Sequence, residues 1–236
     1  MSQFSSVAAI SAQRWVNSAN NHLTEKQALQ AIHVGEPHLF GGERALMDRT
    51  FEGGCRRYLE FGLGGSTLLA IRGGAETVVA VDSDPNWVAA FRTHPEVAPK
   101  IEAGSASVQH ADIGPVGAWG VPFDTRKLRS WPTYISSPWA DWSRRGVLPD
   151  LVYVDGRFRV ACCLSVIVAF GARMPADGGP RVLLHDVTTD RPHYGEVFRF
   201  FDTVESVNTL HLLRTRPDAC RVEALARLLE YQLDPR

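Results

Sequence analysis

The sequence predicts an α/β fold built on a doubly wound, mostly parallel β-sheet. Short apolar segments alternate with helical ones along most of the chain, which is the pattern of repeated βα units. The segments 151–154 and 181–185 are largely apolar, as expected for strands that a parallel sheet buries on both faces. A chain of 236 residues, 44% apolar and 22% charged, has the size and composition of one such domain.

Helices are expected before the first strand. Ser5 or Ser6 can cap a first helix, and Thr24 with Gln27 forms a capping box for a second. The predicted segments are helices over 5–20, 24–34 and 43–51, with a loop over 36–42. Together they would form an N-terminal helical cap over residues 1–50 of a single domain that spans 1–236.

Strands and helices then alternate. Gly73 and Gly74 end the first helix of this series, and Pro192 suits a first helical turn, where its missing N–H costs nothing. The predicted strands cover 57–62, 77–81, 107–110, 151–154, 181–185 and 209–214. The predicted helices cover 66–71, 87–92, 159–170, 192–201 and 221–231.

Residues 114–149 show no clear helix or strand period. This segment holds four of the six tryptophans and five prolines. A stretch of that length without regular structure is typical of a lid or binding loop. We therefore predict a Trp/Pro-rich lid or insertion, which covers either a substrate or only the core.

Composition excludes several classes of protein. A net charge of -1 gives no electrostatic basis for binding nucleic acid or a membrane surface. No apolar run approaches the roughly 20 residues that span a bilayer, and the N-terminus has no signal-peptide pattern. The four cysteines show no CxxC spacing that would indicate a zinc site. We expect a cytoplasmic protein with a small-molecule substrate, and a homodimer through the N-terminal helices stays open.

Three predicted strands end in residues suited to a nucleotide-like ligand. The first is followed by a glycine-rich turn, residues 62–65, where the backbone can approach a ligand closely. The second ends in Asp82, whose carboxylate can accept both hydroxyls of a ribose. The third ends in Asp112 and Ile113, which can flank an adenine. Ligands of doubly wound sheets bind at these carboxyl ends.

The residues around the turn discriminate between ligands. Thr67 stands where a dinucleotide fingerprint has its third glycine, and no P-loop lysine is present. Glu60 would repel a pyrophosphate but suits a ligand with an ammonium group. This favours S-adenosylmethionine as the cofactor, and a NAD(P)-dependent oxidoreductase, which would lack its Tyr-x-x-x-Lys pair, is the weaker alternative.

Residues 60–67, 81–84 and 111–113 resemble the cofactor motifs of class I S-adenosylmethionine-dependent methyltransferases. Residues 151–159 and 183–186 are similar to a narrower group, small bacterial methyltransferase-like proteins, many of unassigned substrate. The resemblance extends from residue 36 to 216 and implies a Rossmann-like sheet of seven strands.

The resemblance also implies a role for each cofactor residue. The glycines would line the methionine part with Glu60 near its amino group, Asp82 would hold the ribose, and Asp112 and Ile113 would flank the adenine. The predicted cofactor set is Glu60, Gly62, Gly64, Gly65, Ser66, Asp82, Ser83, Asp112 and Ile113. The alternative is a strand-to-helix turn without a ligand. Asp84, followed by Pro85, is expected to be a helix N-cap.

Asp155, His185 and Asp186 are the catalytic candidates because they follow buried strands at the same edge. Any of them could act as general base toward a hydroxyl or amine. Metal-dependent catechol-type O-methyltransferases place carboxylates similarly, but Val187 stands where those have asparagine. We therefore do not favour a metal, although a divalent ion held by one or two carboxylates stays open. Ion pairing of Asp155 and a structural role for His185 are the alternatives.

Basic and aromatic residues at this edge are candidates for substrate binding. A guanidinium matches a carboxylate or phosphate, so an arginine pair here suits an acidic substrate. The candidates are Arg157, Arg159, His193, Tyr194 and, from the insertion, Trp119, with Arg191 nearby. A solvated or ion-paired surface is the alternative. We expect methyl transfer to a small-molecule or sugar-like acceptor at O, N or C, and a non-catalytic protein that binds the same cofactor is the rival.

Overall fold

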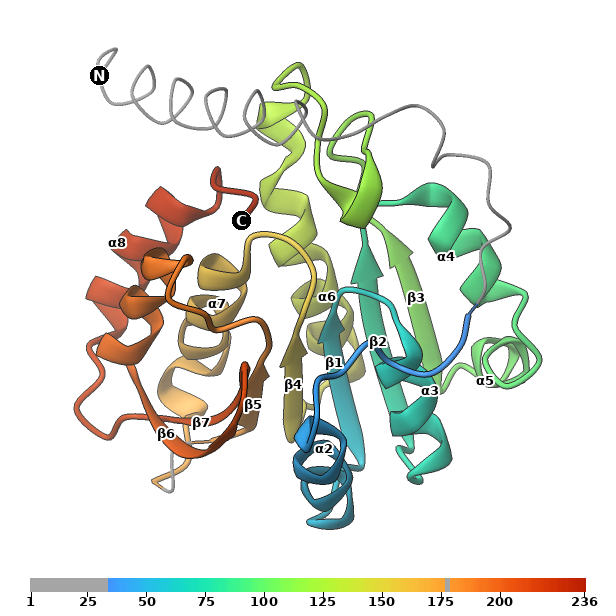
Figure 1. The fold of residues 1–236 in the computed structure, drawn as a ribbon, viewed down its shortest axis with the longest axis horizontal. Coiled ribbons are helices and arrows are strands. Elements are labelled where there is room, and N and C mark those ends of the chain that lie inside the picture. Colours follow the sequence, from blue (N-terminus) through green and yellow to red (C-terminus); the bar gives the residue numbers. More distant parts are fainter. Residues whose placement is uncertain (1–33, 177–178) are drawn as a thin grey trace.

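The computed structural model describes residues 34–176 and 179–236, which form a seven-stranded sheet with helices on both faces (Figure 1). The strand order is β3-β2-β1-β4-β5-β7-β6, with β1 to β5 parallel and β7 antiparallel to both neighbours. The strands are β1 (Arg57–Phe61), β2 (Thr77–Asp82), β3 (Ala106–His110), β4 (Leu151–Val154), β5 (Arg181–Leu184), β6 (Phe201–Val207) and β7 (Leu210–Thr215). The predicted mostly parallel α/β sheet is confirmed.

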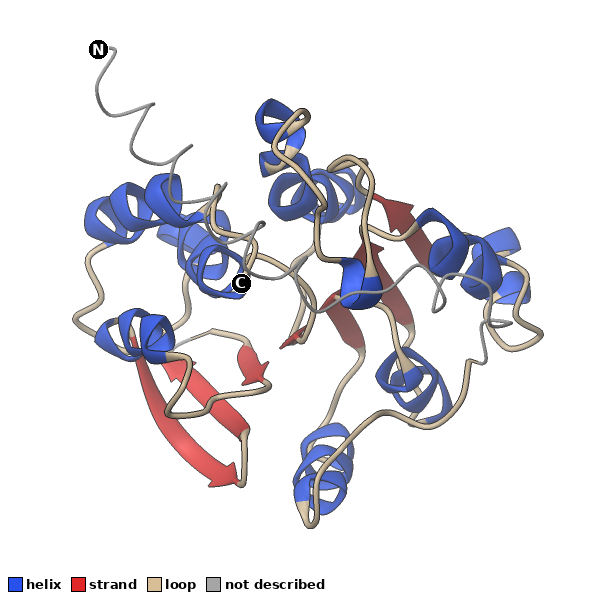
Figure 2. Cartoon of the chain, turned by 45° about the horizontal axis from the view of Figure 1, so that its top comes forward, coloured by secondary structure: helices blue, strands red, loops and turns tan. Residues whose placement is uncertain are grey.

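The helices cover both faces of this sheet (Figure 2). The α-helices are α2 (Glu43–Glu52), α3 (Gly65–Arg72), α4 (Pro85–Arg92), α5 (Ala98–Glu102), α6 (Pro132–Arg145), α7 (Arg159–Phe170) and α8 (Arg221–Tyr231). The 3-10 helices are η2 (Ala118–Gly120), η3 (Leu128–Ser130), η4 (Gly171–Arg173) and η5 (Pro192–Arg199). The two helices expected over 5–20 and 24–34 lie outside the described residues, apart from residue 34. No described helix is long and apolar enough to cross a membrane.

Two apolar cores lie on opposite faces of the sheet because successive side chains of a strand point to opposite sides. Tyr58 of β1 belongs to the core with α2 and α3. Its neighbour Leu59 belongs to the core with α6 and α7. The β4 residues 151–154 are fully buried, which explains why the sequence there lacks polar alternation.

The segment 114–149 is not irregular throughout, which corrects the prediction for it. Its second half forms α6, a 14-residue helix with Pro138 inside it. Trp131, just before α6, and Trp142 within it are 0% exposed, and the Trp131 indole donates to the carbonyl of Ile113 at 2.9 Å. These tryptophans therefore belong to the core, and only the part before α6 lies where a lid could be. Interior proline normally breaks a helix, and this misled the prediction.

The chain after residue 192 also differs from the prediction. Residues 192–199 form the 3-10 helix η5, and the next residues form the edge strand β6 rather than the end of a helix. All but the ends of β6 are exposed, so its sequence shows no apolar alternation. The short helix α5 was not predicted either.

The direction of winding reverses between β1 and β4, which lie side by side although β2 and β3 separate them in sequence. Such a switch point is where doubly wound sheets bind ligands. Gly62, after β1, has φ +109, and a Cβ there would lie 2.7 Å from the amide nitrogen of Gly156, after β4. Both glycines are needed because the two backbones touch at this edge.

Candidate functional site

Glu60 lies in β1 with a carboxylate that is completely buried. Its Oε2 accepts from the hydroxyl of Thr67 at 2.5 Å, and its Oε1 accepts from the hydroxyl of Ser66, both in the first turn of α3. Burial raises the pKa of Glu60 to about 8, against the effect of these hydrogen bonds. Glu60 and Ser66, two predicted cofactor residues, thus already bind each other.

Asp82 connects the end of β2 to the glycine turn. Its Oδ2 accepts from the N–H of Leu63 at 3.0 Å, and its Oδ1 accepts from the N–H of Asp84 at 2.9 Å. Burial raises the pKa of Asp82, and these backbone hydrogen bonds oppose the rise. Asp84 caps α4 through the N–H of Asn86 at 2.8 Å, which confirms its expected structural role.

Two loop segments lie beside the carboxyl ends of β1 and β2. A Cβ on Gly65 would be 2.2 Å from the nitrogen of Pro37, so residues 35–37 lie directly on the start of α3. The Ser83 hydroxyl donates to the carbonyl of Gly120 at 3.1 Å, so η2 lies against the end of β2. Gly64 is extended and its Cβ would meet only Ser66. Gly65 is therefore required by the chain's own backbone, because residues 35–37 occupy the space of a side chain there.

Asp112 and Ile113, expected near an adenine, and Trp119, expected near a substrate, differ in burial and in their partners. Ile113 is 0% exposed and holds Trp131 through its carbonyl, whereas the Asp112 side chain is exposed and pairs with Lys127. The hydrogen bond from Lys127, together with that from the N–H of Gly114, lowers the pKa of Asp112. Trp119 of η2 is 79% exposed with φ +60, and its ring lies 6.3 Å from that of His38, centroid to centroid.

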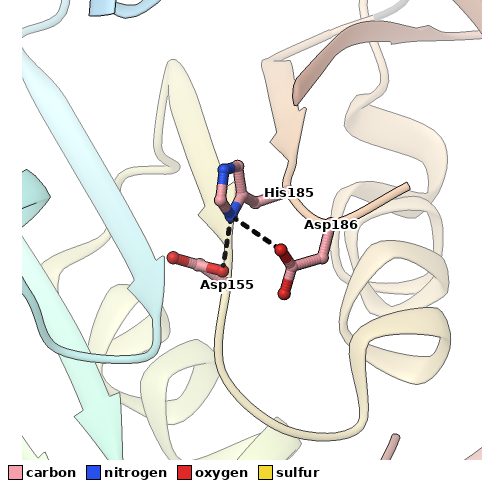
Figure 3. Close-up of side chains that lie close together, drawn as sticks. All are labelled: Asp155, His185 and Asp186. Carbon is pink, nitrogen blue, oxygen red and sulfur yellow. Dashed lines mark hydrogen bonds and ion pairs between the residues drawn. The ribbon is translucent and has the colours of Figure 1, made fainter. Parts of the chain in front are cut away.

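The catalytic candidates do meet at the ends of β4 and β5 (Figure 3). The Nδ1 of His185 lies 3.1 Å from Oδ1 of Asp155 and 3.4 Å from Oδ1 of Asp186. Its Nε2 lies 3.0 Å from Oε2 of Glu43. Asp186 has φ +59, an uncommon conformation for a residue other than glycine, and such strain concentrates at functional sites.

Arg159, buried at the start of α7, holds this cluster together. Its guanidinium lies 3.2 Å from Oδ1 of Asp155 and 2.9 Å from Oδ2 of Asp186. It also donates to the carbonyls of Asp155, Gly156 and His185 at 2.7 to 3.0 Å. With a 3% exposed side chain, Arg159 is enclosed by the chain's own acceptors, which matches the ion-paired alternative rather than the predicted substrate ligand.

Glu43 is a member of the cluster that the sequence did not point to. Its Oε1 accepts from the N–H and the hydroxyl of Thr209, both at 2.8 Å, and its Oε2 also accepts from the N–H of Phe40 at 2.7 Å. Burial alone would raise the pKa of Glu43, but the hydrogen bond to His185 and those backbone and hydroxyl donors lower it. Glu43 lies 142 positions before His185, which directly follows β5, so no local motif signals the contact.

Charges in this cluster balance each other. Burial opposes ionisation and is the largest single effect, but the charges of Arg159 and His185, joined at Asp186 by that of Arg191, together lower the pKa of both Asp155 and Asp186. Burial would lower the pKa of His185, but Asp155, Glu43 and Asp186 raise it to about 9. His185 is therefore a cation at neutral pH, which leaves it no lone pair with which to act as general base.

The charges of this cluster also decide whether it could hold a metal ion. Asp155, His185 and Asp186 lie close enough together to share an ion. All four carboxylate oxygens already have cationic or hydroxyl partners, since Tyr153 donates to Oδ2 of Asp155 at 3.1 Å and Arg191 lies 2.8 Å from Oδ2 of Asp186. A divalent ion would bind beside the positive charges of Arg159, His185 and Arg191, which repel it, so the cluster does not suit one.

The other substrate candidates surround a cavity beside this cluster. Arg157, His193 and Tyr194 line a cavity of about 330 Å³ together with Asp190, Arg191 and Arg236. Three of the five residues predicted to bind substrate therefore line the same cavity. Arg159, which is enclosed in the charged cluster, and Trp119 are not among the residues that line this cavity.

Comparisons with known proteins identify the fold. No protein-family model and no curated protein matches the chain. Among solved structures, it is similar to a methyltransferase-like protein from Silicibacter pomeroyi, with 28% identity and a TM-score of 0.65 over 85% of this chain and 99% of that one. An O-methyltransferase from Bacillus cereus, solved in complex with SAH, matches with 11% identity and a TM-score of 0.46 over 89% of this chain and 91% of that one. A methyltransferase from Geobacter sulfurreducens matches with 13% identity and a TM-score of 0.43 over 85% and 90%.

Proposed function

The chain has the class I methyltransferase fold, and from that premise we propose that it is an S-adenosylmethionine-dependent methyltransferase acting on a small-molecule or sugar-like acceptor. The observation that carries the proposal is the position of Asp82. Its carboxylate ends β2 and binds the N–H of Leu63 in the glycine turn, beside the switch point of the sheet. An acid fixed there is suited to a ribose.

The residues of this half fit an adenosyl cofactor. The two carboxylate oxygens of Asp82 have about four lone-pair sites and accept the backbone N–H groups of Leu63, Ser83 and Asp84, so a site remains for a ribose hydroxyl. Asp112 and Ile113 would lie by the adenine, and the turn at Gly62 and Gly64 by the methionine part. Glu60 would act on the ligand's ammonium group through the hydroxyls of the first turn of α3, since its own oxygens are enclosed there.

Methyl transfer asks little covalent help from the protein. The bound cofactor supplies a methyl group that its sulfonium already activates, so the chain has to align the acceptor and exclude water. Residues 35–37 and 118–120, which lie on Gly65 and Ser83, are placed to shield the cofactor. Asp155, with a 32% exposed side chain, would accept a hydrogen bond from the acceptor's hydroxyl or amine, and His185 and Arg159 would hold it in position.

The same two segments favour a second candidate, a protein that binds the cofactor without transferring its methyl group. They contact the glycine turn and Ser83 directly, which would leave little room for an acceptor on that side. This candidate differs from the first in one respect. It predicts that bound S-adenosylmethionine stays intact in the presence of acceptors.

Calorimetric titration of the protein with S-adenosylmethionine, S-adenosylhomocysteine and NADH tests the proposal. We expect both adenosyl compounds to bind with micromolar affinity and NADH not to bind. A screen of acceptors with a labelled methyl group then separates the enzyme from the non-catalytic binder. Binding of NADH alone would overturn the proposal in favour of an oxidoreductase, and binding of none of the three would leave the glycine turn as a purely structural element.

A further inference from the structure

The cavity beside the cluster has a cationic lining. Of its six lining residues, Arg157, Arg191 and Arg236 carry a guanidinium, and Asp190 carries a carboxylate. Asp190 is exposed, so solvent screens its charge. The cavity adjoins the proposed reaction site because Arg191 pairs with Asp186 at 2.8 Å.

Two of the three arginines already have anionic partners. Arg191 is paired with Asp186, and Arg236 is paired with Asp234. Arg157 has no hydrogen-bond or ion-pair partner for its guanidinium among residues 34–176 and 179–236, and its Nε is buried. Its neighbour in sequence, Arg159, is the opposite case, with five acceptors around one guanidinium.

The buried Nε of Arg157 is a donor without an acceptor, and leaving a buried donor unsatisfied costs free energy. Burial, together with the charge of Arg159, accordingly lowers the pKa of Arg157. The cost is removed when an oxyanion enters the cavity and accepts the free N–H groups. The backbone N–H of Arg157 donates to the hydroxyl of Tyr134 at 3.2 Å, and its Cγ lies 3.9 Å from where a Cβ on Gly120 would be, so the side chain starts beside α6 and η2.

His193 offers a second unused donor. Its Nε2 is buried without a hydrogen-bond partner, and its ring lies edge-on to that of Tyr194 at a centroid distance of 4.4 Å. Burial and the charge of Arg236 lower the pKa of His193 to about 4, so the ring is neutral at physiological pH and can donate one N–H. The cavity thus presents a guanidinium and an imidazole that the protein itself leaves unsatisfied.

We propose that this cavity binds the anionic group of the acceptor, a carboxylate or a phosphate monoester, with Arg157 as its principal ligand and His193 as a second donor. The assignment of the anion to the acceptor rests on the proposed function. The presence of an anion site rests only on the cavity and its unpaired donors.

Thermal unfolding of the full chain in increasing inorganic phosphate or acetate, with sodium chloride keeping the ionic strength constant, tests the site. A ligand that binds only the folded state raises the unfolding midpoint by mass action. We expect a saturable rise with at least one of the two anions, and the stronger of them identifies the group. In Arg157→Gln the apparent affinity should fall about tenfold or more, as when a charged hydrogen bond is lost.

Arg216→Gln is the matched control, because Arg216 is a surface arginine that lines a different cavity and pairs with Asp218. It should bind the anion as the unmodified protein does. Without anion, Arg157→Gln should be at least as stable as the unmodified chain, since an unpaired charge is removed. Equal anion affinity in the unmodified protein and Arg157→Gln, or equal loss in Arg216→Gln, would overturn the site.

Titration of the same variants with S-adenosylhomocysteine separates this inference from the proposed function. We expect Arg157→Gln to bind it with unchanged affinity. Loss of that binding in Arg157→Gln would place Arg157 in the cofactor site and overturn the assignment to the acceptor. If the unmodified protein binds phosphate through Arg157 but not S-adenosylhomocysteine, the proposed function fails while the anion site stands.

Discussion

The two halves of the sheet's carboxyl edge hold their carboxylates in different ways. Over β1 and β2, Glu60 and Asp82 are satisfied by hydroxyls and backbone N–H groups, and burial raises the pKa of both. Over β4 and β5, Asp155 and Asp186 are paired with Arg159 and His185, and their pKa values are lowered. The first half keeps neutral partners, and the second is a balanced set of charges.

This difference suits the two halves to different ligands. In the part of the chain that the structure describes, the first half has no cation beside its carboxyl groups, and Glu60, with a pKa of about 8, is mostly protonated at neutral pH, so this half offers hydrogen-bond acceptors to the hydroxyl groups of a cofactor. In the second half each carboxylate of the cluster is paired with a cation, and Arg157 keeps a positive charge without an anionic partner among the described residues, in a cavity that the exposed Asp190 also lines. The acceptor side is therefore expected to attract an anion, and the cofactor side a neutral or cationic group.

The largest effect should come from Arg159→Met. The substitution leaves Asp155 and Asp186 buried without their main cation, and breaking a buried ion pair in this way costs about 3–5 kcal/mol. Urea unfolding measures the loss, with the exposed Arg173→Met as control. A loss similar to that of the control would show that the charges of the second half do not depend on Arg159. If Arg159→Met does not fold, Arg159→Lys, which keeps the charge, should fold and be less stable than the unmodified chain.

The contact between the halves gives the next effect. Gly62→Ala forces a side chain into φ +109 and against the backbone of Gly156, and should cost about 3 kcal/mol. Gly74→Ala is the control, because Gly74 has φ +91 but nothing within 4 Å, so only the backbone strain of about 1–2 kcal/mol applies. Equal losses in the two variants, measured by urea unfolding, would show that β1 and β4 do not touch closely at the switch point.

The pH dependence of stability separates the halves further. Folding raises the pKa of Glu60 from 4.5 to about 8 and that of His185 from 6.5 to about 9, so above these starting values the folded state binds more protons than the unfolded state. The stability that these protons provide is lost as pH rises, from 4.5 to 8 for Glu60 and from 6.5 to 9 for His185.

Unfolding free energies at a series of pH values should therefore fall by about 4 kcal/mol between neutral pH and pH 9.5. Glu60→Gln has no proton to lose and should abolish the part below pH 8, leaving the part due to His185. A stability that rises from pH 6 to 9.5 would contradict the assigned protonation of both halves.

The smallest expected effect is that of a divalent metal. Because Arg159, Arg191, His185 and Tyr153 already satisfy the carboxylate oxygens of the second half, millimolar Mg²⁺ should leave the unfolding temperature unchanged. A saturable rise that disappears in Asp155→Asn would show that the ion displaces a cation and would revive the metal-dependent mechanism.

The sequence predicted the features that depend on residues close together in the chain. The glycine turn after β1, Asp82 at the end of β2 and the cap at Asp84 were all identified, since strand ends and turn residues follow each other in the chain. The arrival of Asp155, His185 and Asp186 at one place also followed, because adjacent parallel strands end at the same edge. The roles of these residues toward a ligand stay predictions.

What the sequence did not show depends on distant contacts. Glu43 contacts His185 from α2, far away in the sequence. Arg159 points into the cluster because two carboxylates and three carbonyls attract it. Helix α6 was missed because Pro138 and its tryptophans read as an irregular segment, whereas packing against the sheet stabilises it. The edge strand β6 was missed because it is exposed along most of its length.

The most direct test of the account is the affinity of S-adenosylhomocysteine for Asp82→Asn and Asp84→Asn, measured by calorimetry. The two acids are two residues apart, but we propose a cofactor contact only for Asp82, and asparagine replaces Asp84 well as a helix cap. We expect Asp82→Asn to bind about tenfold to a hundredfold more weakly and Asp84→Asn to bind as the unmodified protein does. Equal affinity in folded Asp82→Asn and the unmodified protein would contradict the assignment of the β1–β2 half to the cofactor.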